Sequence, residues 1–357
     1  MTRVAVAGAG SFGRNHLRVY RELEATGQPV ALVAALEPDS ARAAEVAAQY
    51  NIPVFATAEE LLAADLQLHA ASVAVPTVHH HAVASALLEG GLDVLVEKPI
   101  AATLSQADEL VAFAERHNRI LQPGHLERFN PGVLAVQPHL RRPMFFEAHR
   151  LSVFTPRALD VDVVLDLMIH DLDIVLTFAN SPVREVRAVG LPILSPRVDI
   201  ANVRVEFESG CVANFTASRV STERVRKLRY FEPRRYVSID YARRDVLVIR
   251  LDGSVPAEIA AALEGGRIDP AVLAQLAANA GQSAAGPGLS FAKPEIIPGE
   301  PLRLEIESFL QSVRERTAPR VTARQGRNAL ALALEIEASM ATHAERAGLK
   351  NFFEPGA

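Results

Sequence analysis

A lysine at the end of a short apolar run is the first feature of this 357-residue chain that could do chemistry. Residues 94–96 are valine, leucine and valine, a run typical of a parallel strand covered on both faces. Glu97, Lys98 and Pro99 follow, and we expect the strand to end at the proline, which cannot donate a backbone hydrogen bond. Ligands of open α/β sheets collect beyond the carboxyl ends of the strands, where burial or a second cation would let Lys98 exchange protons near neutral pH. The alternative is a solvated lysine in a surface turn.

An acid and an imidazole four residues apart are the second candidate for proton chemistry. Asp166 and His170 lie within residues 160–179, where aliphatic residues leave little room for a solvent face, so the sequence predicts a buried helix. The spacing places both side chains on one face, and Asp162 and Asp173 extend that stripe. A buried carboxylate and imidazole are costly unless they are hydrogen-bonded or functional. We favour a functional pair, and a satisfied interior Asp–His pair is the alternative.

A glycine-rich loop near the start of the chain predicts a nucleotide site. The loop consists of Gly8, Ala9, Gly10, Ser11, Phe12 and Gly13. It follows an apolar strand at residues 4–7 and opens an amphipathic helix that runs toward Gly27. Gly8 allows the tight turn, Gly10 lets a pyrophosphate approach the backbone, and Gly13 lets the helix pack close to the sheet. The position between a strand and a helix makes this G-x-G-x-x-G pattern much more specific than an isolated one.

An acidic residue at the end of the next strand favours NAD as the cofactor. Residues 30–36 form an apolar run that ends in Glu37, Pro38 and Asp39. A carboxylate here accepts hydrogen bonds from the adenosine ribose and repels the 2′-phosphate of NADP. Asp39 or Ser40 could cap the following helix, which would leave Glu37 for the ribose.

Three consecutive histidines invite a metal interpretation that helix geometry rejects. His79, His80 and His81 lie at the start of a predicted helix, where adjacent side chains point in different directions and cannot converge on one ion. One of them could face the cofactor while the others are solvated. We expect no metal site.

The order of the elements predicts an α/β protein with two domains. Strands alternate with helices up to residue 122, which indicates a doubly wound parallel sheet in a domain of residues 1–122. Residues 123–357 form a second domain of α+β type, whose alternating strands predict a large, mostly antiparallel open sheet. One broad face of that sheet must be shielded from solvent by another element, which predicts contacts with another subunit. Residues 253–300, rich in Ala, Gly and Pro, are expected to be an irregular insertion with a short helix near 270–280.

A cluster of cations lies within residues 219–235. It consists of Arg219, Arg224, Arg226, Lys227, Arg229, Arg234 and Arg235. These residues could serve a phosphorylated substrate or a neighbouring subunit, but a solvated strand face or edge protection is the interpretation we prefer for most of them.

Composition excludes several classes of partner. The formal net charge of −5 argues against a general nucleic-acid binder. The single cysteine, Cys211, rules out an internal disulfide, and its alternating apolar neighbours indicate a packing role. No apolar run reaches the roughly 18 residues that a membrane span requires, and the chain starts directly with a strand rather than a signal peptide. We therefore expect a soluble cytoplasmic protein that binds neither nucleic acid nor membrane.

Three motifs in this order resemble the Gfo/Idh/MocA family of NAD(P)-dependent oxidoreductases. They are the loop at residues 8–13, the tripeptide at residues 97–99, and the pair Asp166 and His170. The resemblance covers nearly the whole chain and implies a Rossmann domain followed by an α/β domain whose open sheet usually forms subunit contacts. The implied cofactor is NAD, with NADP less favoured, and the implied assembly is a homodimer or homotetramer.

The resemblance also implies roles for individual residues. Lys98 matches the family's catalytic or substrate-orienting lysine, Asp166 its substrate-binding aspartate, and His170 its general acid/base. Glu97 and Lys98 join the cofactor-binding set, as do Pro76, Thr77 and His80, which match the segment near the nicotinamide. The peptide before the motif proline is often cis in this family, so a cis Lys98–Pro99 bond is predicted.

A narrower similarity suggests the substrate. The segment 124–131, with His125, Glu127, Arg128 and Asn130 as candidate substrate-binding residues, looks, together with residues 219–229, like family members that oxidise the 3-hydroxyl of UDP-N-acetylglucosamine. The predicted function is hydride transfer between a secondary hydroxyl of a sugar or nucleotide sugar and NAD. The alternatives are a dehydrogenase of an inositol, a free sugar or a sugar acid, and a non-catalytic NAD-binding regulator.

Overall fold

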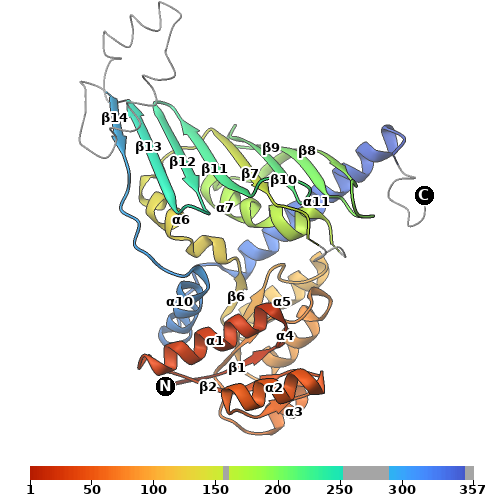
Figure 1. Cartoon of the computed structure of the whole chain (residues 1–357), viewed down its shortest axis with the longest axis vertical. Coiled ribbons are helices and arrows are strands. Elements are labelled where there is room, and N and C mark those ends of the chain that lie inside the picture. Colours follow the sequence, from red (N-terminus) through yellow and green to blue (C-terminus); the bar gives the residue numbers. More distant parts are fainter. Residues whose placement is uncertain (156–160, 252–288, 350–357) are drawn as a thin grey trace, which may run out of the picture. The chain divides into compact units, whose positions relative to one another are not determined.

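The computed structural model describes residues 1–155, 161–251 and 289–349 (Figure 1). Contacts divide the chain into two compact units. The first unit comprises residues 1–129 and 299–334, and the second comprises residues 130–298 and 335–357. The sequence predicts a boundary at residue 122 and a single domain after it, whereas residues 299–334 return to the first unit.

A six-stranded parallel sheet forms the centre of the first unit, with the order β3-β2-β1-β4-β5-β6. Its strands are β1 Thr2–Ala7, β2 Val30–Leu36, β3 Val54–Phe55, β4 Ala70–Val73, β5 Asp93–Glu97 and β6 Leu121–Gly124. The strand order reverses between β1 and β4, and ligands of doubly wound sheets bind at such a switch point. The predicted Rossmann sheet is confirmed.

Helices and short 3-10 turns connect these strands. They are α1 Ser11–Ala25, α2 Ser40–Tyr50, α3 Ala58–Ala63, η1 Thr77–His79, α4 His80–Glu89, α5 Leu104–Arg116 and η2 Leu126–Phe129. Several begin at polar caps that satisfy the first backbone amides, as at Thr103, which forms a reciprocal capping box with Gln106 before α5. Polar caps of this kind make the starts of the helices readable from sequence.

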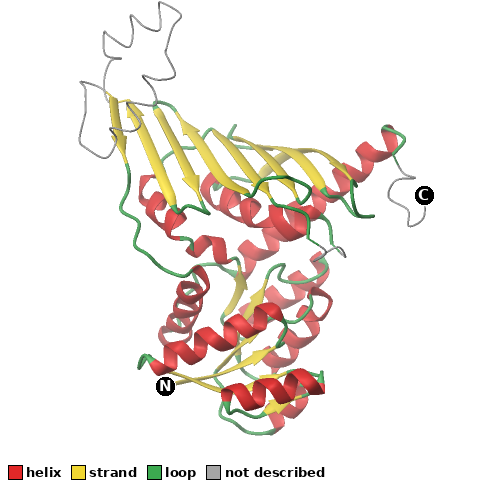
Figure 2. Cartoon of the chain, viewed as in Figure 1, coloured by secondary structure: helices red, strands yellow, loops and turns green. Residues whose placement is uncertain are grey.

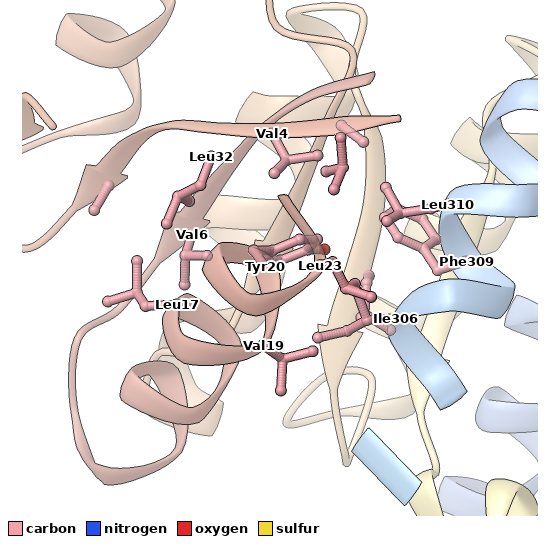
Figure 3. Packing of buried hydrophobic residues seen from close by; sticks show 14 of the residues in the cluster. Val4, Val6, Leu17, Val19, Tyr20, Leu23, Leu32, Ile306, Phe309 and Leu310 are labelled. Atoms are coloured by element: carbon pink, nitrogen blue, oxygen red, sulfur yellow. The ribbon is translucent and has the colours of Figure 1, made fainter. Parts of the chain in front are cut away.

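Helix α10, Pro301–Glu315, explains why the chain returns to the first unit. Its apolar side chains Ile306, Phe309 and Leu310 lie in one buried cluster with Tyr20 and Leu23 of α1, as Figure 3 shows. Fully burying a side chain of this size contributes roughly 1.5–3 kcal/mol. Residues 299–334 are therefore part of the first unit's core although they follow the second unit's strands in sequence.

The second unit contains an eight-stranded sheet with the order β14-β13-β12-β11-β7-β10-β9-β8. Its strands are β7 Phe145–Leu151, β8 Val183–Leu191, β9 Ile200–Phe207, β10 Val212–Ser218, β11 Val225–Glu232, β12 Arg235–Asp240, β13 Asp245–Leu251 and β14 Leu289–Ala292. Only β7 and β10 pair in parallel, so the predicted mostly antiparallel sheet is confirmed. Strand β14 lies in the segment expected to be irregular, and it forms because it can pair with β13.

The helices of the second unit lie along one face of this sheet (Figure 2). They are α6 Pro131–Val136, η3 Gln137–His139, the π-turn η4 Val164–Met168, α7 Ile169–Ala179, and the end of α11 Ala323–Arg346, which begins in the first unit. The short helix expected near residues 270–280 lies outside the described residues. In the part of the chain that the structure describes, no helix is both long and apolar enough to span a membrane.

Candidate active site

A cavity of about 690 Å³ lies in the first unit at the switch point of its sheet. Six residues that the sequence assigned to the cofactor line it, namely Gly8, Gly10, Ser11, Phe12, Glu37 and Pro76. Arg42 and His79 also contribute to the wall. The structure therefore brings the glycine loop and the acidic end of β2 together.

The glycine loop leaves room for an anion at the start of α1. Gly8 has a φ of +92°, and a Cβ atom there would lie 2.6 Å from the Ala74 carbonyl oxygen. A Cβ on Gly10 would meet nothing within 4 Å, and no side chain caps the helix that follows. The first amides of α1 are thus left for a ligand, and the helix dipole favours a negative one. This open loop fits the pyrophosphate of NAD.

Glu37 is held by three donors. Its carboxylate accepts hydrogen bonds from the Ala9 amide at 2.9 Å, the Asp39 amide at 2.9 Å and the Arg42 guanidinium at 3.0 Å. Burial disfavours the charged form, but these bonds outweigh it, so the pKa of Glu37 is lowered. Asp39 caps α2 by accepting from the Arg42 amide at 2.9 Å. Because Asp39 is the helix cap, Glu37 is not needed for capping and remains the predicted acceptor for the ribose.

The end of β5 presents Lys98 between two fixed neighbours. Lys98 is half-buried, and its peptide bond to Pro99 is cis, as predicted. The Glu97 carboxylate lies 2.9 Å from Nε2 of His16 in α1. His80 places its Nδ1 2.7 Å from the Pro99 carbonyl oxygen and its Nε2 2.9 Å from that of Val75. Both neighbours of Lys98 are therefore tied to other elements of the same unit.

The three histidines occupy three different environments. His79 lines the cavity, His80 is buried under the end of β5, and His81 pairs with Glu109 at 2.9 Å. Thr77 begins the 3-10 turn that contains His79. His80 is the histidine predicted from the sequence to bind the cofactor, and His79 is the one that lines this cavity. Adjacent positions in a turn differ in burial, and only the packing of α4 on the sheet decides which one faces inward.

In the second unit, Asp166 lies inside the π-turn η4 and His170 in the first turn of α7. Both side chains are half-buried, not fully buried as the apolar sequence of this segment predicted. The π-turn changes which side chains face inward, and π-turns occur often at functional sites. The pair is therefore accessible enough to meet a ligand.

Two buried ion pairs that the sequence did not reveal fix this segment. Arg150 at the end of β7 forms a bidentate pair with Asp171, with distances of 2.7 and 3.0 Å. Arg219 donates to Asp199 at 2.7 Å and to the Val161 carbonyl oxygen at 2.9 Å. The only signal in the sequence was an arginine at the end of an apolar strand. Arg219, counted in the basic cluster, is thus an interior residue and not part of a solvated face.

The remaining candidate substrate residues are more than nine-tenths buried. They are His125, Glu127, Arg128 and Asn130. Arg128 donates to the Arg320 carbonyl oxygen at 3.3 Å, and Asn130 caps α6 through the Gly132 amide at 3.0 Å. The structure assigns the first three to the first unit and Asn130 to the second.

Family models match both parts of the chain. The model described as the NAD-binding Rossmann fold of an oxidoreductase family matches residues 2–125, and the GFO/IDH/MocA C-terminal domain matches residues 133–233. The UDP-N-acetylglucosamine 3-dehydrogenase of Acidithiobacillus ferrooxidans is 31% identical over 346 residues, covering 96% of this chain and 99% of that protein. The chain belongs to the GFO/IDH/MocA family.

Solved structures agree with this family assignment. The structure of the A. ferrooxidans enzyme superimposes with a TM-score of 0.79 at 30% identity, covering 94% of this chain and 96% of that one. A levoglucosan dehydrogenase in complex with NADH shares the fold, with a TM-score of 0.78 at 16% identity over 96% of this chain and 97% of that one. Inositol 2-dehydrogenase of Acidothermus cellulolyticus is 28% identical, but over only 52% of this chain and 56% of its own length. This GFO/IDH/MocA protein is thus an NAD-binding oxidoreductase, as predicted.

Proposed function

We propose that this GFO/IDH/MocA protein transfers a hydride between the C3 hydroxyl of a UDP-N-acetylhexosamine and NAD. The observation that carries the proposal is the end-to-end similarity to a UDP-N-acetylglucosamine 3-dehydrogenase. The inositol dehydrogenase matches only 52% of this chain and 56% of its own length, so about half of each chain is left without similarity. Inositols, free sugars and sugar acids are the competing substrates.

The proposed role of each residue follows from the chemistry of its side chain. NAD, when bound, supplies the acceptor for the hydride that leaves carbon 3. Lys98 donates a hydrogen bond to the substrate oxygen and stabilises the negative charge that develops there. His170 takes the hydroxyl proton, and Asp166 orients His170 or a neighbouring hydroxyl. General base catalysis of this kind contributes about 10²–10⁴-fold.

A homodimer or homotetramer through the open sheet is part of the same proposal. Phe145, Phe231, Tyr236 and Ile249 are directly paired across β7, β11, β12 and β13. All four are half-buried, whereas one neighbour of each along its strand points to the opposite face and is buried, namely Phe146, Tyr230, Val237 and Val248. An apolar row on the uncovered face supports a subunit contact there. We place the assembled enzyme in the cytoplasm.

Absorbance at 340 nm tests the proposed reaction. Purified protein is mixed with NAD and, in separate reactions, UDP-N-acetylglucosamine, its uronic acid, myo-inositol or glucose, with NADP in parallel. A rise with UDP-N-acetylglucosamine and NAD is expected. If absorbance rises only with myo-inositol or only with glucose, that compound is the substrate and the proposal of a UDP-N-acetylhexosamine is wrong. No rise with any of them, while NAD still binds, would favour a substrate outside the panel, a bound cofactor that needs a second substrate for recycling, or a non-catalytic NAD-binding role.

A further inference from the structure

The Glu97 side chain points into the interior of the first unit rather than toward solvent. Its Oε1 lies 2.9 Å from Nε2 of His16, whose side chain is completely buried, while the Glu97 side chain is 11% exposed. A buried carboxylate is costly unless a donor compensates it. His16 is therefore the partner that makes the inward position of Glu97 possible.

We infer that His16 and Glu97 form a positioning pair that fixes the backbone carrying Lys98, an inference that rests on the proposed role of Lys98. His16 belongs to α1, the helix whose first turn faces the cofactor cavity. Glu97 is the last residue of β5 and directly precedes Lys98. The pair thus links the helix that receives the pyrophosphate to the lysine that contacts the substrate oxygen.

The hydrogen-bonding capacity of the imidazole supports this role. Among the described residues, Nδ1 of His16 is buried without a partner, so the ring's contact with Glu97 is its only hydrogen bond. A neutral ring with its proton on Nε2 donates to Glu97 and leaves only an acceptor atom unpaired. A protonated ring would instead bury an N–H group without an acceptor, which is the costlier arrangement. His16 therefore serves as a single, directed donor.

The neighbouring strand leaves space for the Glu97 side chain. Glu97 pairs in register with Gly124 of β6. A Cβ atom on Gly124 would lie 2.9 Å from both Cδ and Oε1 of Glu97, closer than real Cβ contacts. Glycine at this position is thus required for the carboxylate to reach His16, and the position of Glu97 is fixed from two sides.

His80 completes the arrangement on the other side of the lysine. Its two ring nitrogens contact the carbonyl oxygens of Pro99 and Val75. The residues before and after Lys98 are therefore each held by a buried histidine, while Lys98 itself remains half-buried. The backbone on both sides of Lys98 is therefore held in place, which fixes the point from which its side chain extends.

Variants of His16 distinguish a role in positioning Lys98 from a role in the stability of the fold alone. His16→Leu removes the donor, and His16→Gln restores an N–H near the position of Nε2. Tyr20→Phe is the matched control, because Tyr20 lies one turn further along α1, is equally buried, and loses only its 2.8 Å bond to Ser72. Gly124→Ala displaces Glu97 from the opposite side and remains informative if His16→Leu fails to fold.

Lysine labelling of the protein without added ligand gives a readout that does not depend on turnover. The chain contains only four lysines, Lys98, Lys227, Lys293 and Lys350, so labelling of Lys98 by a limiting amine reagent can be compared with the other three in one digest. We expect His16→Leu and Gly124→Ala to change the relative labelling of Lys98 severalfold. We expect His16→Gln and Tyr20→Phe to leave it close to wild type.

Kinetics supply the second readout. Misplacement of a catalytic group by about 1 Å can cost 10²-fold, so kcat should fall by about that factor in His16→Leu, with KM and the NADH dissociation constant changing less than about threefold. Unchanged Lys98 labelling and kcat in both His16→Leu and Gly124→Ala would overturn the inference. Altered Lys98 labelling in a protein that does not oxidise UDP-N-acetylglucosamine would retain the positioning pair and reject the proposed substrate.

Discussion

The Glu37 carboxylate accepts a hydrogen bond at 2.9 Å from the backbone amide of Ala9, a residue inside the glycine loop. The acidic end of β2 thus supports the glycine loop, where we expect the pyrophosphate, while Arg42 donates to the same carboxylate. Glu37 therefore links the loop predicted for the phosphates to the strand end predicted for the ribose. Changes at Glu37 should affect both affinity and cofactor choice.

Replacement of Glu37 by glutamine tests this double role. The variant loses the charge that repels a 2′-phosphate and releases Arg42, whose side chain is 48% exposed, to meet one. Hydrogen bonds to charged groups contribute about 1.5–3 kcal/mol, so NAD should bind about tenfold or more weakly, and NADP should gain relative to NAD. Titration with NADH and NADPH measures both constants. Glu45→Gln, which breaks an exposed pair with Arg14, is the control, and an unchanged NAD/NADP ratio in Glu37→Gln would contradict the assignment.

Two glycines of the loop should respond differently to alanine. A Cβ on Gly13 would lie 1.9 Å from the Gly8 carbonyl oxygen, so Gly13→Ala should lower the melting temperature or prevent folding. A Cβ on Gly10 would enter open space beside the cavity, so Gly10→Ala should keep its melting temperature and weaken NAD binding. Thermal unfolding and NADH titration distinguish the two. Full NAD affinity in a folded Gly10→Ala protein would place the pyrophosphate elsewhere.

Lys98→Met should abolish most turnover and retain NAD. Removing one hydrogen-bond donor from a developing oxyanion costs about 10²–10³-fold in kcat. Because Lys98 is proposed to contact the substrate oxygen, the NADH dissociation constant should stay close to wild type. Stopped turnover together with lost NADH binding would instead assign Lys98 to the cofactor alone.

His170→Ala should lower kcat by about 10²–10⁴-fold, because the variant lacks the base that takes the hydroxyl proton. The loss should be largest at low pH, and alkaline buffer should restore part of the rate. A pH–rate profile of wild type and variant makes the comparison. Profiles of the same shape in the two proteins would exclude the base role.

The ion pair of Asp199 predicts how stability depends on pH. Burial opposes ionisation of this carboxyl, but hydrogen bonds from Ser195, Arg219 and two backbone amides lower its pKa to about 2. Because the folded value lies below the ordinary 3.8, the stabilisation is complete above pH 4 and is lost as the pH falls toward 2. The shift corresponds to about 2 kcal/mol at neutral pH.

Urea unfolding of Asp199→Asn at pH 7 and pH 3 checks this prediction. The variant should be less stable than wild type at pH 7 by at least about 2 kcal/mol, and the difference should shrink at pH 3. Asp245→Asn, which alters an exposed 3.6 Å pair with Lys293, should behave like wild type. An equal loss for Asp199→Asn at both pH values would show that the charge is not the source of the stability.

Features that depend on a local pattern of residues could be predicted before any contact between distant residues was known. The glycine loop before α1, the alternation along β9 and β10, and the Lys98–Pro99 end of β5 were all readable, because strand period, glycine spacing and proline act within a few residues. The cofactor followed from Glu37 at the end of an apolar strand. Family membership followed from the order of these motifs.

Features that depend on packing between residues far apart in the chain are visible only in the folded protein. Glu97 meets His16 across 81 positions, Arg219 meets Asp199 across a β-strand pair, and α10 returns to α1 after nearly 300 residues. The π-turn that leaves Asp166 and His170 half-buried has no local signature either. The spacing of residues along a chain predicts which side chains share a face of a helix or strand. Which other element packs against that face depends on the burial of apolar surfaces and on the hydrogen-bond donors available to buried charges.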